Sequence, residues 1–145
     1  MENFEELEKY KETKSFFFEP TDTLSKVCNA PRNKSGVYLV YAVEGNQEEL
    51  IYIGRSGKKE PDGSMFVRKA GSGGINDRIV GGKQFGEPRR NSWKKQMDIE
   101  NIKKMKIYWY VTHNENFVDC PMDVENVLLT KYFSTYGKRP RWNKE

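Results

Sequence analysis

Apolar and polar positions along the chain predict three β-strands. Residues 36–43, "GVYLVYAV", and residues 49–55, "ELIYIGR", are rich in the β-branched and aromatic side chains that strands favour. The intervening "EGNQE" carries a Gly-Asn pair, which is a hairpin signal. Residues 105–112, "MKIYWYVT", form a third segment of the same kind. We therefore expect a small three-stranded antiparallel sheet.

Four other segments show the spacing of apolar residues that is typical of helices. They are residues 2–12, a stretch after Pro20, the glycine-bounded "GGINDRIVGG" at 73–82, and the segment from Pro121 to Gly137. Helices that flank a small sheet define a mixed α/β (α+β) domain. This is the fold class that we expect.

The size and composition of the chain indicate one domain with a modest core. It has 145 residues, of which 36% are hydrophobic and 32% are charged. No stretch approaches the roughly 18 consecutive apolar residues of a membrane helix, and "MENFEELEKYK" lacks the order of a signal peptide. We expect a soluble, cytoplasmic protein with no membrane contact, built as a helical extension at 1–33 and a domain at 34–145.

Positive charge is concentrated in the middle of the chain. The net charge is +4, but residues 55–106 hold 14 Lys/Arg against 6 Asp/Glu, whereas residues 1–54 hold 6 against 10. A basic block suits a polyphosphate partner such as DNA, although a solvated lysine-rich face has the same composition. The candidate backbone contacts are Arg55, Lys58, Lys59, Arg68, Lys69, Arg89, Arg90, Lys94 and Lys95. Phe85 and Trp93, which lie among them, either stack on bases or pack in the core.

Glu125 is the most unusual residue of the last predicted helix. It falls within an apolar row that also contains Met122, Leu128, Leu129, Tyr132 and Phe133. A carboxylate in such a row needs a basic partner or a cation, because a buried charge without a partner is costly. A cation bound to Glu125 alone would retain several waters, as Mg²⁺ does beside phosphates. Both alternatives stay open.

Other catalytic patterns receive little support from the sequence. His113 is the single histidine and follows the third predicted strand, so a Ser-His-Asp or Cys-His mechanism is poorly supported. There is no phosphate-binding GxxxxGK[ST] motif and no GxGxxG motif after a strand. If the protein is an enzyme, we expect its base to be a tyrosine or a metal-bound water.

Five features in order resemble the GIY-YIG nuclease family. They are "GVY" at 36–38, "YIG" at 52–54, a helical arginine, a helical glutamate and a C-terminal asparagine, and the resemblance covers residues 36–143. The resemblance implies that Tyr38 and Tyr52 face the scissile phosphate, with Tyr38 favoured as the phenol that activates the attacking water. The glycines beside the two tyrosines are then places where the DNA backbone comes close.

The remaining site residues follow from the same resemblance. Arg78 would stabilise charge on the phosphate, Glu125 would bind Mg²⁺ or Mn²⁺, and Asn143 would brace the site. Arg55, which directly follows "YIG", could reach a phosphate oxygen. The gap from Gly54 to Arg78 is longer than in compact members of the family, so Arg68 is an alternative catalytic arginine. A histidine that some relatives carry beyond this arginine is absent here.

The resemblance thus implies a divalent-metal-dependent endonuclease that hydrolyses DNA phosphodiester bonds. The alternative is a non-catalytic nucleic-acid-binding or adaptor module that keeps the fold. Specificity, cleavage of RNA, a homodimer that cuts both strands, and a restriction, repair or mobile-element role stay open.

Overall fold

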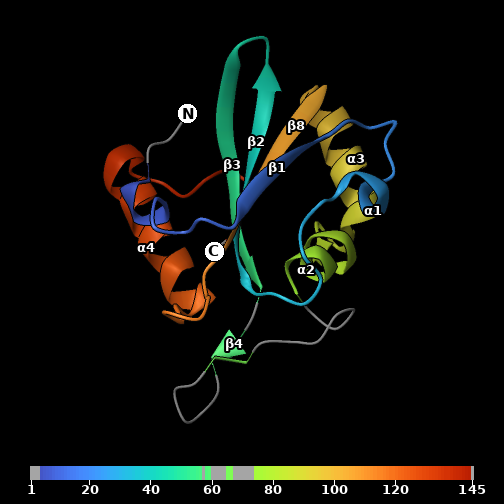
Figure 1. The fold of residues 1–145 in the computed structure, drawn as a ribbon. Helices are drawn as coiled ribbons and strands as arrows, with labels where there is room; N and C mark the ends of the chain where they lie inside the picture. The colour runs from blue at the N-terminus through green and yellow to red at the C-terminus, as the bar shows by residue number, and fades with distance from the viewer. Residues whose placement is uncertain (1–3, 57, 60–64, 67–73, 145) are drawn as a thin grey trace.

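A computed structural model describes residues 4–56, 58–59, 65–66 and 74–144 (Figure 1). For residues 58–59 and 65–66 it describes the backbone alone. Its centre is an antiparallel sheet with four strands in the order β1-β8-β2-β3. These are β1 (Thr13–Phe18), β2 (Gly36–Glu44), β3 (Gln47–Ser56) and β8 (Lys104–Val111). The class is therefore mixed α+β as predicted, but the expected count of three strands is wrong.

The fourth strand, β1, lies in the N-terminal stretch that the sequence assigns to a helical extension. It pairs with β8 from Thr13↔Tyr110 to Phe18↔Met105. Phe16 and Phe18 are buried, whereas Phe17 between them is 45% exposed. Three consecutive phenylalanines conceal this alternation in the sequence. Residues 13–18 are thus an integral part of the sheet.

Strands β2 and β3 form the predicted hairpin around a turn in which Gly45 has a φ of 60°. Tyr38 pairs with Gly54 and Val40 pairs with Tyr52. The register then shifts, because Tyr41 pairs with Leu50 and Ile51 is the extra residue of a β-bulge. Since alternate residues share a face of a sheet, this register places Tyr38 and Tyr52 on the same face.

Helices cover both faces of the sheet (Figure 1). On one face lie α1 (Leu24–Val27), α2 (Ile75–Gly81) and α3 (Arg89–Glu100). The other face is covered by α4 (Pro121–Tyr136) and by the 3-10 helix η1 (Glu5–Leu7). Each face has its own apolar cluster. Two pairs of two-residue strands complete the description: β4 (Lys58–Lys59) with β5 (Met65–Phe66), and β6 (Lys83–Gln84) with β7 (Glu87–Pro88).

The last helix begins and ends where the sequence predicts. Pro121 opens α4, and Gly137 closes it in the left-handed conformation with a φ of 72°. Val124, Leu128 and Tyr132 are buried, whereas Phe133 is 54% exposed, so its place in the predicted inward row is wrong. The first predicted helix is reduced to η1, and α3 has no counterpart among the sequence predictions. Among the described residues, no helix has the length and apolarity needed to cross a membrane.

Candidate functional site

Two tyrosines lie side by side on the face of the sheet that carries α2 and α3. The ring centroids of Tyr38 and Tyr52 are 6.0 Å apart at an interplanar angle of 44°. Tyr38 is 1% exposed and Tyr52 is half-buried. The two phenols that the sequence singles out are therefore neighbours, but only Tyr52 has an accessible side chain.

The glycines beside these tyrosines make room for the protein itself. A Cβ atom at Gly54 would lie 2.4 Å from Cζ of Tyr38, and one at Gly36 would lie 1.9 Å from the carbonyl oxygen of Tyr110. These contacts explain both glycines without DNA, and the expectation that the DNA backbone approaches there stays a prediction. Their role is to let Tyr38 and strand β8 pack closely.

Burial keeps Tyr38 a neutral phenol. Removal from water raises its pKa well above the ordinary value near 10, and the neighbouring Tyr52 adds to this effect. The positive charges of Arg89 and Arg78 lower the pKa but do not outweigh burial. Tyr38 is therefore less suited to activate a water molecule than the sequence-based preference for it assumes.

Arg89 lies beneath the tyrosine pair and is 4% exposed. Its Nη2 donates to the hydroxyl of Tyr52 at 3.2 Å and its Nε donates to Oε1 of Gln84 at 3.0 Å. Its Cζ lies 5.4 Å from the centroid of the Tyr52 ring and 5.6 Å from that of Tyr38. The expectation that Arg89 grips DNA from the surface is wrong, because its side chain is used inside the fold.

Glu125 lies on the opposite side of the sheet and is paired with Arg55. Nε of Arg55 donates to Oε1 of Glu125 at 3.1 Å, with side chains 28% and 18% exposed. Burial raises the pKa of Glu125, whereas Arg55, Arg139 and Arg78 lower it without cancelling the rise. Of the two alternatives for a carboxylate at this position, the free protein has the ion pair.

Arg78 connects the two sides of the site electrostatically. It lies on α2 with an exposed side chain, and its charge lowers the pKa of Tyr38 and also that of Glu125. Its backbone carbonyl accepts a hydrogen bond from Nη1 of Arg89 at 2.5 Å. Arg78 is therefore the exposed cation that acts on both predicted catalytic groups. Arg68, the alternative arginine, lies outside the described residues.

The C-terminal tail holds strand β3 at this point. Asn143 Oδ1 accepts from the backbone N–H of Ile53 at 2.9 Å, and its Nδ2 donates to the carbonyl of Ile53 at 2.9 Å. The backbone N–H of Trp142 donates to the carbonyl of Ile51 at 2.8 Å. Asn143 thus braces the strand that carries Tyr52 and Arg55.

The predicted phosphate contacts are only partly at the surface. Arg90 and Lys95 are exposed and Lys94 is half-buried, although Lys95 is also paired with Glu87 at 2.8 Å. The side chains of Lys58, Lys59, Arg68 and Lys69 lie outside the described residues. Trp93 is 0% exposed, and Phe85 packs edge-on against Trp142 at 5.1 Å. Core packing therefore accounts for Trp93, which is not available to stack on bases.

His113 has a structural role in place of the catalytic one that the sequence already disfavours. Its Nε2 accepts from the backbone N–H of Ser35 at 3.1 Å. Burial lowers its pKa, Lys34 lowers it further, and Glu12 raises it in part. A neutral imidazole that accepts a backbone hydrogen bond is the state that this arrangement favours.

A divalent cation fits this site only together with a phosphate. Within the described part of the chain, no three His, Cys, Asp or Glu side chains are grouped closely enough to hold a metal. Glu125 can supply one carboxylate, whose Oε2 has no hydrogen bond to a described residue. Mg²⁺ commonly takes one or two carboxylates and fills its other positions with water and phosphate oxygens. Glu125 matches that requirement.

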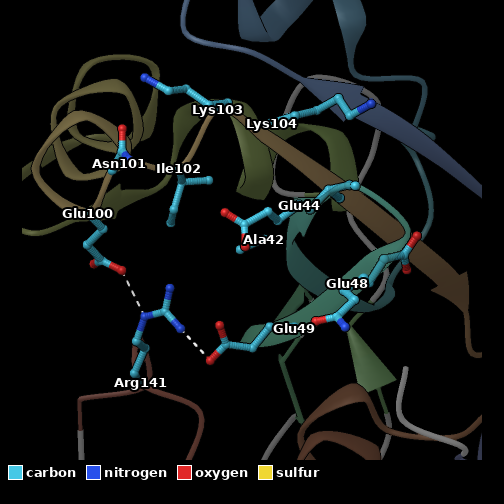
Figure 2. A pocket seen from close by; sticks show the side chains of 13 residues that line it. Ala42, Glu44, Glu48, Glu49, Glu100, Asn101, Ile102, Lys103, Lys104 and Arg141 are labelled. Atoms are coloured by element: carbon cyan, nitrogen blue, oxygen red, sulfur yellow. Dashed lines mark hydrogen bonds and ion pairs between the residues drawn. The ribbon is translucent and has the colours of Figure 1, made fainter.

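A pocket of about 520 Å³ lies at the other end of the sheet, beside the β2–β3 turn (Figure 2). Arg141 bridges Glu49 and Glu100 at its wall. None of the five predicted catalytic residues lines this pocket. The pocket lies where Arg141 attaches the C-terminal tail to β3 and α3, and it is separate from the candidate site.

Comparison with known protein families, with curated proteins and with solved structures finds no match to this chain. The candidate site therefore stands on its own geometry. Tyr52 contacts α3 on one side of β3, and Arg55, three residues later, contacts α4 on the other. The predicted catalytic residues thus gather around one edge strand.

Proposed function

We propose that this chain is a divalent-metal-dependent endonuclease of the GIY-YIG type that hydrolyses DNA phosphodiester bonds. The proposal rests on one observation: the tyrosine pair, Glu125 and Asn143 surround strand β3, and Arg78 acts electrostatically on both sides of it. These groups come from β2, β3, α2, α4 and the C-terminal tail, and together they provide one carboxylate, two phenols and an exposed guanidinium at one edge of the sheet.

The chemistry follows from the charges at this edge. A phosphodiester beside β3 would meet the exposed guanidinium of Arg78, which stabilises negative charge as it builds on the phosphoryl oxygens. A Mg²⁺ or Mn²⁺ ion, when bound, polarises the phosphate and lowers the pKa of the attacking water. Glu125 would hold the ion, and Arg55 would turn from Glu125 to a phosphate oxygen.

Cleavage of supercoiled plasmid in the presence of Mg²⁺ tests the proposal. The parent protein should nick the plasmid, and Glu125→Gln should lose about a hundredfold or more in rate, because a neutral amide is a poor Mg²⁺ ligand. Glu115→Gln, which alters an exposed carboxylate away from the site, is the matched control. Equal nicking by Glu125→Gln and the parent would contradict the role of Glu125. Failure of the parent to cut duplex, single-stranded and branched DNA would contradict the function.

The alternative, a nucleic-acid-binding module without catalysis, is supported by the Arg55–Glu125 ion pair, which satisfies Glu125 without a metal. DNA binding that is salt-dependent but indifferent to Mg²⁺, with no cleavage, would favour it. The variant Arg90→Gln should then reduce the slope of log affinity against log salt by about one.

A further inference from the structure

Aromatic rings and ammonium groups alternate along the part of the sheet that β1 and β8 form. Phe17 on β1 lies directly opposite Lys106 on β8. Nζ of Lys104 lies 4.7 Å from the ring centroid of Phe17. Nζ of Lys106 lies 5.2 Å from the same centroid and 4.9 Å from that of Tyr108. We call these four residues, Phe17, Lys104, Lys106 and Tyr108, the lysine–aromatic strip.

The strip lies on the face of the sheet that carries α4, but toward its outer side. Lys106 pairs with Tyr41 of β2, which belongs to the apolar cluster beneath α4. Helix α4 packs mainly on β3 and β2, so the strip on β1 and β8 lies beyond most of that cover. Phe17 is 45% exposed as a result. Its ring is therefore open to a partner, and no residue of the strip belongs to the candidate catalytic site.

Positive charge on the strip exceeds negative charge. Among the described residues, no carboxylate forms an ion pair with Lys104. Lys106 has one such partner, Glu48, at 4.0 Å, and Oε1 of Glu48 also accepts from the hydroxyl of Tyr108 at 3.0 Å. Glu44 lines the pocket of Figure 2 together with Glu48 and Lys104, but it forms no ion pair with either lysine of the strip. An approaching anion thus meets at least one ammonium group without a counter-charge.

The combination of an open ring and free positive charge selects one class of partner. Each nucleotide of a single strand offers a flat base that stacks on an aromatic ring and a phosphate that attracts lysine. The bases of a duplex are stacked on one another and are not available to an isolated ring on a sheet. An apolar protein surface would cover Phe17, but it would bury the ammonium groups without opposite charge, which is costly.

We infer that the lysine–aromatic strip is a binding site for single-stranded nucleic acid, in which a base stacks on Phe17 while Lys104 and Lys106 contact the adjacent phosphates. The two ammonium groups lie over the ring in the free protein, so a base displaces them by the short distance that brings them to its own phosphates. This site goes beyond the proposed nuclease function, because binding there requires neither a metal nor cleavage.

Fluorescence anisotropy with a labelled oligothymidylate of about 12 nucleotides tests the role of the ring. EDTA in the buffer removes divalent cations, so cleavage plays no part. Phe17→Leu, which keeps an apolar side chain on the strand, should weaken binding by about 5- to 150-fold, as expected for the loss of one stacked base. Phe133→Leu, which changes a ring that is 54% exposed on α4, should bind as the parent does. Equal affinities of Phe17→Leu and Phe133→Leu overturn the inference, as does a parent that does not bind.

The salt dependence of the same binding tests the phosphate contacts. Lys104→Gln should make the slope of log affinity against log salt less steep by about 0.7, the value for one phosphate contact on a single strand. Lys26→Gln, which removes an exposed ammonium from α1, is the matched control. An unchanged slope in Lys104→Gln overturns the inference. Binding of a labelled oligoglutamate in place of the oligothymidylate would assign the strip to an acidic protein and would also overturn it.

Nuclear magnetic resonance locates the contact in the parent protein and does not depend on the stability of a variant. The ring signals of Phe17 should shift when the oligothymidylate is added, whereas those of Phe133 should stay in place. Unshifted Phe17 signals at saturation overturn the inference. A parent that binds through Phe17 but cuts no DNA would contradict the nuclease function alone, and a parent that nicks plasmid without this binding would contradict only the inference.

Discussion

The Asn143 side chain forms two hydrogen bonds with the backbone of one residue, Ile53, and thereby occupies the outer edge of strand β3. Both bonds are 2.9 Å long, one accepted by Oδ1 and one donated by Nδ2. An exposed strand edge presents unpaired N–H and C=O groups, and here a side-chain amide satisfies them at the centre of the "YIG" segment. The tail of the chain therefore fixes the position of Tyr52 and Arg55.

Asn143→Ala should weaken both folding and cleavage. Loss of two hydrogen bonds at a half-buried strand should lower the free energy of unfolding by about 1–3 kcal/mol. The cleavage rate should also fall, because β3 carries Tyr52 and Arg55. Urea unfolding and plasmid nicking measure the two effects, with Asn126→Ala on the exposed side of α4 as the control. If Asn143→Ala is as stable and as active as Asn126→Ala, the bracing role is wrong.

Gly54→Ala should displace Tyr38. The added methyl group would lie 2.4 Å from Cζ of Tyr38 and 2.6 Å from its hydroxyl oxygen, which is closer than any normal contact. Overpacking of this kind costs about 1–3 kcal/mol of stability. Because the clash includes Cζ, Tyr38→Phe should not relieve it, whereas Tyr38→Leu should do so in part.

A double-mutant cycle of Gly54→Ala with Tyr38→Leu and with Tyr38→Phe measures this contact by urea unfolding. Additive free energies for the Gly54→Ala and Tyr38→Leu pair would show that the two residues do not constrain each other.

The sequence predicts those parts of the fold that are encoded in local patterns. Alternating aromatic and β-branched residues locate β2, β3 and β8, and Pro121 and Gly137 delimit α4. Helix α3 is not found, because its inward row contains Arg89 and Ser92 beside Trp93 and Met97. Half of that row is polar, so it lacks the apolar period that identifies a helix.

Some residues of the candidate site can be predicted from local motifs, and others cannot. Motif order indicates Tyr38, Tyr52, Glu125 and Asn143, and the structure places each of them around β3. Arg89 is misread as a surface cation, because its neutral partners are on β3, on α2 and at Gln84, and only the tertiary fold shows them. A signal does exist, since Arg89 lies four residues before Trp93, and side chains at this spacing share one face of a helix.

The stability of Glu125→Gln relative to the parent should depend on pH. Burial raises the pKa of Glu125 in the folded protein, and Arg55 opposes this only in part. A carboxyl whose pKa is raised by folding binds its proton more tightly in the folded state, so its contribution to stability is present in acid and is lost as pH rises through the raised pKa. Gln cannot ionise and loses nothing.

The free energy of unfolding of Glu125→Gln, minus that of the parent, should therefore increase as the pH rises above about 4, the ordinary range of a glutamate carboxyl. Urea unfolding in metal-free buffer across this range measures it, with Glu115→Gln as the exposed control. A difference that decreases with pH would mean that the Arg55 ion pair dominates over burial.

Arg141→Ala should loosen the tail that carries Asn143. Arg141 forms ion pairs with Glu49 and with Glu100, and Figure 2 shows both. Trp142 Nε1 also donates to Glu100, at 2.8 Å. Because the Arg141 side chain is 39% exposed, the loss should be only about 1 kcal/mol and should shrink in high salt. Lys103→Ala, which changes another cation of the same pocket, is the matched control.

Stability measured at acidic pH tests the interaction between Arg141 and Glu100 more directly. Burial by itself would raise the pKa of Glu100, but hydrogen bonds from Gln96, Arg141 and Trp142 lower it overall. The stability that Glu100 contributes is therefore present at neutral pH and is lost as pH falls through its lowered pKa. Arg141→Ala removes one cause of that lowering, so the stability gap between parent and variant should narrow below about pH 4. A gap that stays constant from neutral pH into acid would show that Arg141 holds the tail by packing and not through its charge.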